Sequence, residues 1–594
     1  MGFIHAVSLA EKVVIMASAL LSNRGKYYLL TIVCLVAFFP VFSADYLKFD
    51  EQFSILNNPV LKMPLNLESL LQIFCSFTEN QYTPLSTLTF WLEYNLFGFI
   101  SFISHLINLL IHIFGVFAFY HVTYYLLKKE TDALLLSLIW AIHPMQVESV
   151  AWVIGRRTLL YGSFFFASIA FYLKYLDTNK KADKYLAIIM MALSSLSKTL
   201  AFSAPAIWLA IDWIKGRKIT FNLLKEKTLS IILAVVLILI MLIAAKSGVI
   251  NNDKQDLYWR QAAFAIGDYP LLTAYPHNLS GLNELNSYSL EIIQPGFIYL
   301  SIYIAISVYL ACYRKLALFG FLFYLFHIFP MSGLIRVGYP FYISYHFCYV
   351  AQLGIILQFY EGVKLIKQKF LNSVNFRKIS YSVAIIIILV FTVQTFQFSI
   401  VWQNSEYFAL NALKIDQYNR FARGILCHHY KTNNDFDKLA YHSQKQIRLH
   451  ENYYRGYADL CEAYIHKQDF KQALLLINKA IELKGTFSTE LTNTRAYCYY
   501  RLEEWEKAEN DYTKVLEVLE AHLMARTFRA ICRDIQGKRY LANEDYKILN
   551  KLQPYNIEIK IKWLINRLKS LDIVSSLQIG ISIFSLILQE LQTN

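Results

Sequence analysis

Apolar residues run through the first two thirds of the chain in long blocks that short polar segments separate. A membrane-spanning helix needs about 20 mainly apolar residues. Eleven blocks approach or reach that length, near residues 27–44, 101–127, 132–142, 159–176, 185–198, 199–214, 229–247, 296–312, 316–330, 347–363 and 379–400. Three blocks are short, and we expect those to be tilted, broken or buried in protein. The pattern predicts a polytopic helical membrane domain over residues 27–402.

After residue 402 the pattern becomes more polar and acquires a period. Phe436, Phe470 and Trp505 are 34 and 35 residues apart, and a small-residue position recurs in four units at Leu439, Ala473, Ala508 and Ala542. A 34-residue period of aromatic and small residues is the signature of tetratricopeptide repeats. We therefore predict an all-α chain in which repeats over 403–556 form an α-solenoid, with about eight helices over 418–556. Capping helices follow over 557–594, where a twelfth membrane segment is the alternative.

The loops between the blocks differ in charge, and this predicts the orientation. The loops that follow the second, fourth, sixth, eighth and tenth blocks are rich in Lys and Arg, as at Lys128, Lys129, Lys180, Lys181, Lys215, Arg217, Arg314, Lys315, Lys364 and Lys367. The first long loop, 45–98, holds two Lys and six acids. Cytoplasmic loops carry the excess of Lys and Arg. We expect segment 1–26 to be cytoplasmic or interfacial, and loop 45–98 and the repeats to lie on the non-cytoplasmic side.

Composition narrows the class of protein. The chain is 56% hydrophobic and 17% charged, with a formal net charge of +14, whereas soluble domains are about 45–50% apolar and 25% charged. We attribute the positive charge to membrane orientation, and expect membrane lipids but no nucleic acid as partners. Eight Cys without a CxxC pair suggest no zinc site. Cys427 and Cys461, like Cys498 and Cys532, are 34 residues apart, so we expect them to pack inside the repeats.

Several short motifs in the membrane half bring together residue types that carry chemistry. Two adjacent carboxylates, Asp50 and Glu51, follow the first block, and such a pair is consistent with a general base or a metal ligand. The other motifs are His105–His112, His143–Pro144–Met145–Gln146–Val147–Glu148, Gly155–Arg156 and Ser197–Lys198. A solvated acidic turn, without catalysis, is the alternative for the acidic pair.

In this order, ahead of the repeats, these motifs resemble the transmembrane-and-tetratricopeptide O-mannosyltransferases and their bacterial relatives. The resemblance covers roughly residues 27–550 and implies a GT-C-type glycosyltransferase. Such an enzyme takes a sugar from a polyprenyl-phosphate carrier, here the donor substrate, and gives it to a protein hydroxyl. A further cofactor is not implied, and a divalent metal is neither predicted nor excluded.

The resemblance also assigns roles to residues. Asp50 or Glu51 would deprotonate the acceptor hydroxyl, and Arg156 and Lys198 would hold the lipid phosphate, which leaves as an anion. Adjacent residues do not face the same way, and we favour Asp50 as the base because its shorter side chain is more tightly positioned. His143, Glu148 and Arg336 complete the candidate substrate-binding set.

Each assignment has a structural alternative. His143 caps a helix beside Pro144, Glu148 pairs with Arg156, and Arg156 and Lys198 are snorkelling anchors. His105 and His112 are expected to pack between helices, and Arg336 to contact either donor phosphate or lipid head groups.

The chain also departs from the family. Arg157–Thr158 stands where the family has an acid soon after its G-R motif, and Tyr345–His346 replaces an acid–arginine pair. These departures bear on the identity of the substrate.

We therefore predict a polyprenyl-phosphate-dependent protein O-glycosyltransferase, with the repeats presenting the acceptor. The expected location is a bacterial inner membrane with periplasmic repeats, and the alternative is the endoplasmic reticulum with lumenal repeats. Two other functions stay open: an envelope polysaccharide ligase or polymerase, and a non-catalytic membrane-anchored repeat scaffold. An intramembrane cation such as Lys198 is costly to keep without a role, which argues against the scaffold.

Overall fold

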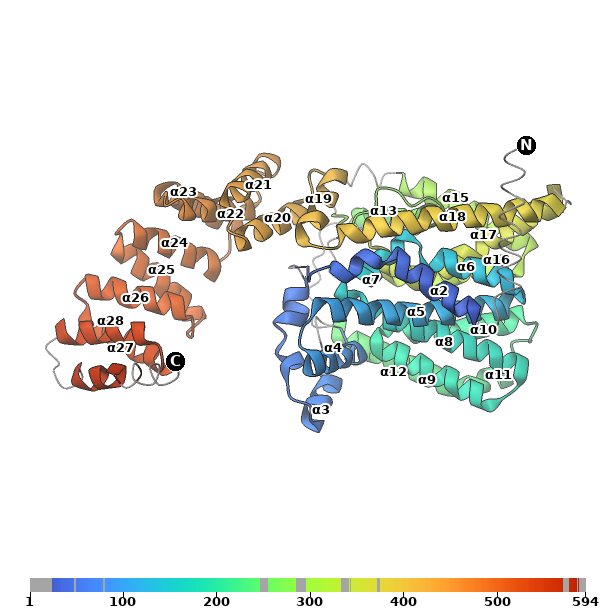
Figure 1. Cartoon of the computed structure of the whole chain (residues 1–594), viewed down its shortest axis with the longest axis horizontal. Coiled ribbons are helices and arrows are strands. Elements are labelled where there is room, and N and C mark those ends of the chain that lie inside the picture. The colour runs from blue at the N-terminus through green and yellow to red at the C-terminus, as the bar shows by residue number, and fades with distance from the viewer. Residues whose placement is uncertain are drawn as a thin grey trace. The chain divides into compact units, whose positions relative to one another are not determined.

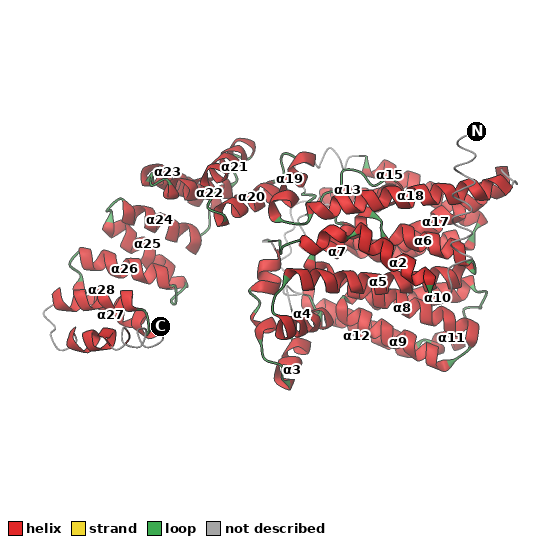
Figure 2. Ribbon diagram, viewed as in Figure 1, coloured by secondary structure: helices red, strands yellow, loops and turns green. Residues whose placement is uncertain are grey.

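The computed structural model describes residues 24–47, 50–77, 81–245, 255–284, 295–332, 341, 343–370, 374–569, 576–584 and 586. Its regular elements in these ranges are helices, with one isolated bridge between Glu284 and Phe341 (Figure 2). The chain forms two compact units, Met1–Ala422 and Arg423–Asn594. We describe each unit by itself and call them the membrane unit and the repeat unit. The predicted all-α fold class is confirmed.

The membrane unit is a bundle of helices, most of which lie side by side (Figure 1). Its α-helices are α2 (Gly25–Ala37), α3 (Leu67–Cys75), α4 (Pro84–Phe97), α5 (Ser101–Leu127), α6 (Glu130–Ala141), α7 (Val147–Ala151), α8 (Arg156–Thr178), α9 (Lys181–Ser197), α10 (Ala204–Ile214), α11 (Phe221–Glu226), α12 (Thr228–Ala245), α13 (Gln255–Ala274), α15 (Gly296–Tyr313), α16 (Lys315–Ile328), α17 (Cys348–Phe370), α18 (Val374–Val401) and α19 (Ser405–Ile415). Short helical turns join them: η1 (Phe39–Ser43), η2 (Gln52–Leu56), η3 (Pro59–Lys62), η4 (Pro144–Gln146), η5 (Val153–Gly155), η6 (Thr199–Ser203), η7 (Phe329–Met331) and η8 (Tyr345–Phe347). Among the described residues, each of the eleven apolar blocks contains helix.

Four of the described helices are long and apolar enough to cross a membrane: Ser101–Leu127, Val153–Thr178, Gly296–Tyr313 and Phe376–Val401. Glu130–Ala141 and Pro144–Ala151 together form a fifth candidate that is bent by 52°. Shorter apolar helices, such as Gly25–Ala37 and Lys315–Met331, supply further candidates. The protein is therefore a polytopic helical membrane protein, while the total of eleven spans stays a prediction.

Close packing in the bundle depends on glycine where α16 crosses α17. A Cβ atom on Gly320 would lie 2.5 Å from the Gly354 carbonyl oxygen, and one on Gly354 would lie 2.3 Å from the Gly320 carbonyl oxygen. Real Cβ atoms essentially never approach other atoms that closely. The two backbones therefore touch directly at this crossing.

Basic loops that are distant in sequence meet at one end of the bundle. Lys128 and Lys215 both pair with Asp177, and Lys26 pairs with Glu130. We call this the basic end. Loop 45–98 lies at the opposite end, the first-loop end, where Ser101 donates a hydrogen bond of 2.5 Å to the Ala44 carbonyl.

Helix α13 covers most of segment 257–280. Ten consecutive residues, 261–270, are buried, so the helix packs into the unit, chiefly against α15 and α17. Tyr269 donates to the Ser344 carbonyl at 2.7 Å, and the Thr273 carbonyl lies 3.1 Å from His143 Nε2. The contacts of its C-terminal half therefore lie at the first-loop end.

The repeat unit is a stack of antiparallel helix pairs. Its helices are α20 (Arg420–Thr432, which begins in the membrane unit), α21 (Phe436–Leu449), α22 (Tyr454–His466), α23 (Phe470–Lys484), α24 (Thr489–Arg501), α25 (Trp505–Val518), α26 (Leu523–Ile535), α27 (Arg539–Leu552) and α28 (Ile557–Lys569). The predicted eight helices are thus α20 to α27. The second helix of each pair begins 34 or 35 residues after the second helix of the preceding pair.

The small-residue position explains the period. Leu439, Ala473, Ala508 and Ala542 are all 0% exposed, because each lies where one helix of the pair packs against the next. Cys427, Cys461, Cys498 and Cys532 are buried free thiols, as predicted. The aromatic position is less enclosed, since Phe470 is buried but Phe436 and Trp505 are only partly so. Of the expected capping segment, α28 and residues 576–584 are helical, and the rest lies outside the described residues.

Candidate functional site

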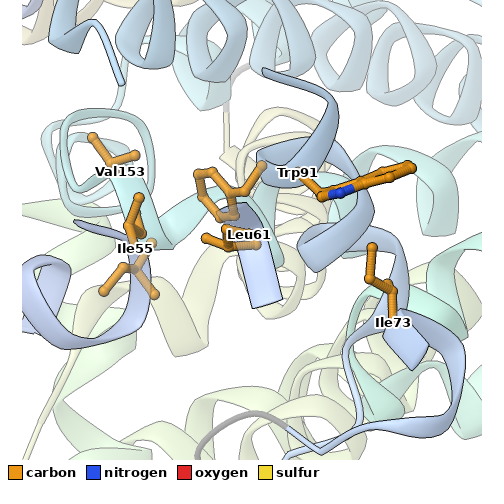
Figure 3. Packing of buried hydrophobic residues seen from close by; sticks show 7 residues of the cluster. Ile55, Leu61, Ile73, Trp91 and Val153 are labelled. Atoms are coloured by element: carbon orange, nitrogen blue, oxygen red, sulfur yellow. The ribbon is translucent and has the colours of Figure 1, made fainter. Parts of the chain in front are cut away.

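The carboxyl group of Glu51 attaches the first loop to the bundle. Its two oxygens accept hydrogen bonds from the backbone N–H groups of Leu47 at 2.5 Å and Val153 at 2.8 Å. An apolar cluster reinforces this attachment, and Figure 3 shows its members Ile55, Leu61, Ile73, Trp91 and Val153. Residues of the loop and of η5, about one hundred positions apart, are thereby fixed next to each other.

Burial decides the protonation of Glu51. Its side chain is 1% exposed, and this desolvation raises the pKa of Glu51 to about 8, although the two N–H donors lower it in part and the nearby Asp50 charge raises it further. A carboxyl group with this pKa carries a proton at neutral pH. Asp50, by contrast, is only partly buried. Of the two acids, Asp50 is therefore the more accessible, and its role as the base stays a prediction.

A small recess lies between the first loop and the helices α4 and α8. Its lining combines the first loop, the start of α4 and the start of α8, and consists of Ser54, Ile55, Asn58, Leu61, Thr83, Ser86, Thr87, Phe90, Ile154 and Arg157. Its volume is about 20 Å³. Ser54 lies about one turn after Asp50, and its buried hydroxyl has no hydrogen-bond partner among the described residues. Arg157 is partly exposed and reaches towards Gln81 at 3.5 Å.

Arg156, the arginine that we expected to hold the donor phosphate, lies in a different environment. Its guanidinium is 0% exposed and forms an ion pair of 2.5 Å with Glu93. It also donates to the Asn108 side chain at 2.9 Å and to the Ser104 carbonyl at 3.1 Å, and it stacks 3.9 Å above the Phe90 ring. Nε and Nη2 thus donate hydrogen bonds, while Nη1 faces the Glu93 carboxylate. The environment favours a structural role, and neither the phosphate role nor a snorkelling anchor fits it.

The histidine–proline motif marks the break in a bent helix pair. His143 precedes Pro144 and caps η4, because its Nδ1 accepts from the Met145 N–H at 3.2 Å. It is fully buried, and Nε2 faces the Thr273 carbonyl. This geometry matches the capping alternative. The glycine of the G-R motif is needed for packing, since a Cβ on Gly155 would lie 2.4 Å from the Ser149 carbonyl oxygen.

Glu148 holds the segment that replaces the family's acid–arginine pair. Its carboxylate accepts from the Tyr345 N–H at 2.9 Å and the Ser344 hydroxyl at 2.5 Å, and lies 2.5 Å from His346 Nδ1. The alternative that Glu148 pairs with Arg156 is wrong, because Arg156 pairs with Glu93. The loss of the family's arginine leaves an imidazole at this place. Burial lowers the pKa of His346, and the hydrogen bond to Glu148 opposes that shift.

Lys198 lies beside the same segment. It follows the last residue of α9, and its ammonium group is 3.4 Å from the Thr158 hydroxyl and 5.3 Å from the centre of the Phe347 ring. Thr158 stands where the family carries an acid. The neighbour of the Lys198 ammonium group at this position is therefore a hydroxyl and not a carboxylate. None of the ion pairs among the described residues includes Lys198. Arg157 and Lys198 lie near enough to each other for repulsion.

The remaining candidates fall outside this group. His105 and His112 are fully buried, and each faces a backbone carbonyl of the bent helix region, Ala151 and Ala141 respectively, at 3.0 and 2.8 Å. This is the interhelical packing that we predicted. Arg336 lies outside the described residues. Within the described ranges, no cluster of three or more His, Cys, Asp and Glu side chains is placed to hold a metal ion.

Two residues of the site were missed by reasoning from the sequence. Arg157 was noted only as a departure, although a second arginine directly after Gly155–Arg156 is a visible signal. His346 was likewise noted only as a replacement. Its contact with Glu148 joins positions 198 residues apart, and no local pattern indicates such a contact.

Comparison with curated proteins finds relatives that are named protein O-mannosyl-transferases. Protein O-mannosyl-transferase F38B6.6 of Caenorhabditis elegans is 29% identical over 195 residues, which are 30% of this chain and 26% of the worm protein. TMTC3 of Mus musculus is 28% identical over 173 residues, 27% of this chain and 18% of its own length. Human TMTC3 is 31% identical over 131 residues, 21% and 14% of the two chains. The matches therefore span about a quarter or less of these relatives.

The predicted resemblance to the transmembrane-and-tetratricopeptide O-mannosyltransferases is thus confirmed at the level of sequence. No family model matches the chain. Among solved structures, the tetratricopeptide protein YrrB covers 30% of this chain with 14% identity and a TM-score of 0.28, and MamA of Desulfovibrio magneticus covers 28% with 11% identity and a TM-score of 0.27. The assignment of the repeats rests on the helix pairs and their spacing.

Proposed function

We propose that this protein is a membrane-bound glycosyltransferase that moves mannose from a polyprenyl-phosphate donor to a protein hydroxyl on the non-cytoplasmic face. One arrangement supports the proposal: the partly exposed Asp50 precedes Glu51, which accepts from the Val153 N–H, and both Arg157 and the Lys198 ammonium group lie at the start of α8, a few residues after Val153. An acid near two cations is what the transfer needs. The names of the sequence relatives support the same reaction.

The proposed reaction is a single displacement that inverts the anomeric carbon. Asp50 takes the proton of the acceptor hydroxyl while the oxygen of that hydroxyl forms a bond to C1 of the sugar. The bond between C1 and the phosphate oxygen breaks, and the polyprenyl phosphate leaves with the electron pair. Arg157 and Lys198 stabilise the negative charge that develops there. Arg157 replaces Arg156 in this role because the guanidinium of Arg156 is enclosed by Glu93, Asn108 and Ser104.

The repeat unit would recognise the acceptor protein. Repeat arrays of this kind use extended concave surfaces for binding, which suits a peptide segment that carries a serine or threonine.

The test is transfer by the full-length protein reconstituted in liposomes that contain a polyprenyl-phosphate mannose donor. We expect mannose on a hydroxyl-bearing peptide, detected by mass spectrometry, and loss of this product in Lys198→Ala together with weaker donor binding. Lys479→Ala, an exposed repeat lysine, is the matched control. Donor binding without transfer to any protein, but with transfer to a glycan, would favour the polysaccharide enzyme. Neither binding nor transfer would favour the scaffold.

A further inference from the structure

The last helices of the repeat unit expose apolar side chains in a regular pattern. Six large apolar residues on α28 and in the helical segment 576–584 are between 43% and 68% exposed: Ile561, Ile565, Leu568, Leu577, Ile581 and Phe584. They fall three to a helix, with a spacing of four and then three positions. Residues at this spacing lie on one face of a helix. Each helix therefore carries an apolar stripe, and we call the two stripes the C-terminal apolar face.

The opposite sides of both helices are packed. Ile559 on α28 is 5% exposed and belongs to the apolar cluster of the last repeat, and Ile579 and Ile583 are 7% and 9% exposed. The Lys560 ammonium group donates to the Ser582 hydroxyl, so the two helices are neighbours. Terminal repeats of a solenoid need a polar outer face to stay soluble. Two apolar stripes on the last helices of this stack (Figure 1) therefore indicate a surface that meets a partner.

The charge of α28 decides between kinds of partner. The helix holds four cations against the single acid Glu558, and segment 576–584 holds no charged residue. Lys562 and Glu558 pair at 2.6 Å, and Lys569, whose side chain is 52% exposed, lies 3.5 Å from Asp534. A second copy of the face would place like charges together, which disfavours self-association. A basic helix with an apolar stripe is instead typical of a helix that lies in the interface of a bilayer with acidic lipids.

We propose that the C-terminal apolar face lies on the surface of the bilayer that holds the membrane unit, where it meets acidic phospholipids. The two units belong to one chain, and this tether keeps the bilayer at a high effective concentration for the repeat unit. The stripes enter the boundary between head groups and acyl chains, as interfacial helices do, and Lys562, Arg567 and Lys569 contact the lipid phosphates. The repeat unit is then held at its last helices by lipid as well as at its first helix by the chain.

The test uses the full-length protein in nanodiscs, because the single bilayer of a disc is the one that holds the membrane unit. A nitrobenzoxadiazole fluorophore is attached at Ile581→Cys after the exposed Cys75 and Cys312 are replaced by serine. Leu475→Cys on α23 is the matched control, since Leu475 is also apolar and 65% exposed but lies outside the face. The discs contain lipids brominated near the head group, which quench the fluorophore on contact, with or without phosphatidylglycerol.

We expect quenching at position 581 in the acidic discs, weaker quenching there in the neutral discs, and little at position 475 in either. Lys569→Gln should lower the ratio of bound to free ends by roughly 5-fold, the contribution of one basic residue near an acidic membrane surface. Lys479→Gln, which changes an exposed lysine outside the face, should leave that ratio unchanged. Fluorescence at position 581 that is quenched no more than at position 475 would overturn the proposal.

Two other occupants of the face would give different results, and either result would refute the inference. Equal quenching in acidic and neutral discs, strongest with bromine at the ends of the acyl chains, would show that segment 576–584 enters the bilayer as a span. Dimers in detergent that Leu577→Ser abolishes, without quenching at position 581, would show that a second copy covers the face. These measurements do not depend on sugar transfer, so their outcome is independent of the proposed function.

Discussion

The two adjacent acids of the first loop have separate tasks, and a pair of variants distinguishes them. Asp50→Asn should lower transfer by about 10²–10⁴-fold, the usual contribution of a general base, without changing the midpoint of thermal unfolding. Glu51→Gln should act through stability, because an amide NH₂ cannot accept from Leu47 or Val153, and an unsatisfied backbone N–H costs about 1–3 kcal/mol. If Glu51→Gln abolishes transfer at an unchanged midpoint while Asp50→Asn stays active, the roles are reversed.

The protonation of Glu51 also predicts how stability depends on pH. Its folded-state pKa, about 8, is above the ordinary value of 4.5, so the folded protein binds a proton that the unfolded chain releases. The resulting stabilisation is complete below pH 4.5 and is lost as the pH rises through 8, by about 1.4 kcal/mol for each unit of difference between the two pKa values. Thermal unfolding between pH 5 and 9 should show this decline in the wild-type protein and a weaker one in Glu51→Gln. The exposed Glu68→Gln is the control, and an unchanged slope in Glu51→Gln would contradict the assignment.

Among the elements, the later repeats carry a charge pattern with the same period as their apolar pattern. Arg495 binds Asp511 through two bonds of 2.7 and 2.9 Å, and Arg529 binds Asp545 through two bonds of 3.0 and 2.7 Å. Both arginines and both aspartates are 34 residues apart. Such bidentate pairs fix geometry as well as charge, so they help to set how the helices of a repeat pack.

Asp545 forms ion pairs with three arginines, and its loss should destabilise the repeat unit. Arg526, Arg529 and Arg533 all converge on its carboxylate, which is 2% exposed. Asp545→Asn leaves three neighbouring cations without their shared anion, and breaking a buried pair costs about 3–5 kcal/mol. Glu482→Gln, which breaks an exposed pair with Lys479, should change stability by less than about 0.5 kcal/mol. Chemical denaturation of the full-length protein, followed by repeat-unit fluorescence, measures both, and equal effects would contradict the network.

The elements also show what the sequence could and could not reveal. The repeats were predictable because each helix pair repeats its own local pattern and needs only its neighbours. In the membrane unit the apolar blocks predicted the helices. They did not predict that Arg156 pairs with Glu93, or that Glu148 binds the segment 344–346. Such long-range contacts between polar side chains leave no periodic signal. For this reason the sequence led us to predict a phosphate as the partner of Arg156, whereas in the structure its partner is the carboxylate of Glu93.

For the whole molecule, the decisive prediction is which end of the membrane unit faces the cytoplasm. The basic end gathers Lys26, Lys128 and Lys215 around Glu130 and Asp177, and Lys and Arg are retained on the cytoplasmic side. At the first-loop end, the backbone N–H of Asp45 donates to the Gln403 carbonyl at 2.8 Å. The start of the first loop and the end of α18 therefore lie together, and both should be external.

Reporter fusions test this arrangement directly. Fusions after Lys129 and Lys181 should read cytoplasmic, and a fusion after Gln417 should read external. Helix α13 is the element that could change the parity, because it is 20 residues long, yet the described contacts of its C-terminal half, with His143 and Ser344, belong to the first-loop end. If α13 crosses the membrane, the fusion after Gln417 reads cytoplasmic, and the repeats are then separated from Asp50 by the bilayer. That result would leave the repeat unit no access to an acceptor at the site, and the proposed role of the repeats in presenting it would fail even if transfer itself is observed.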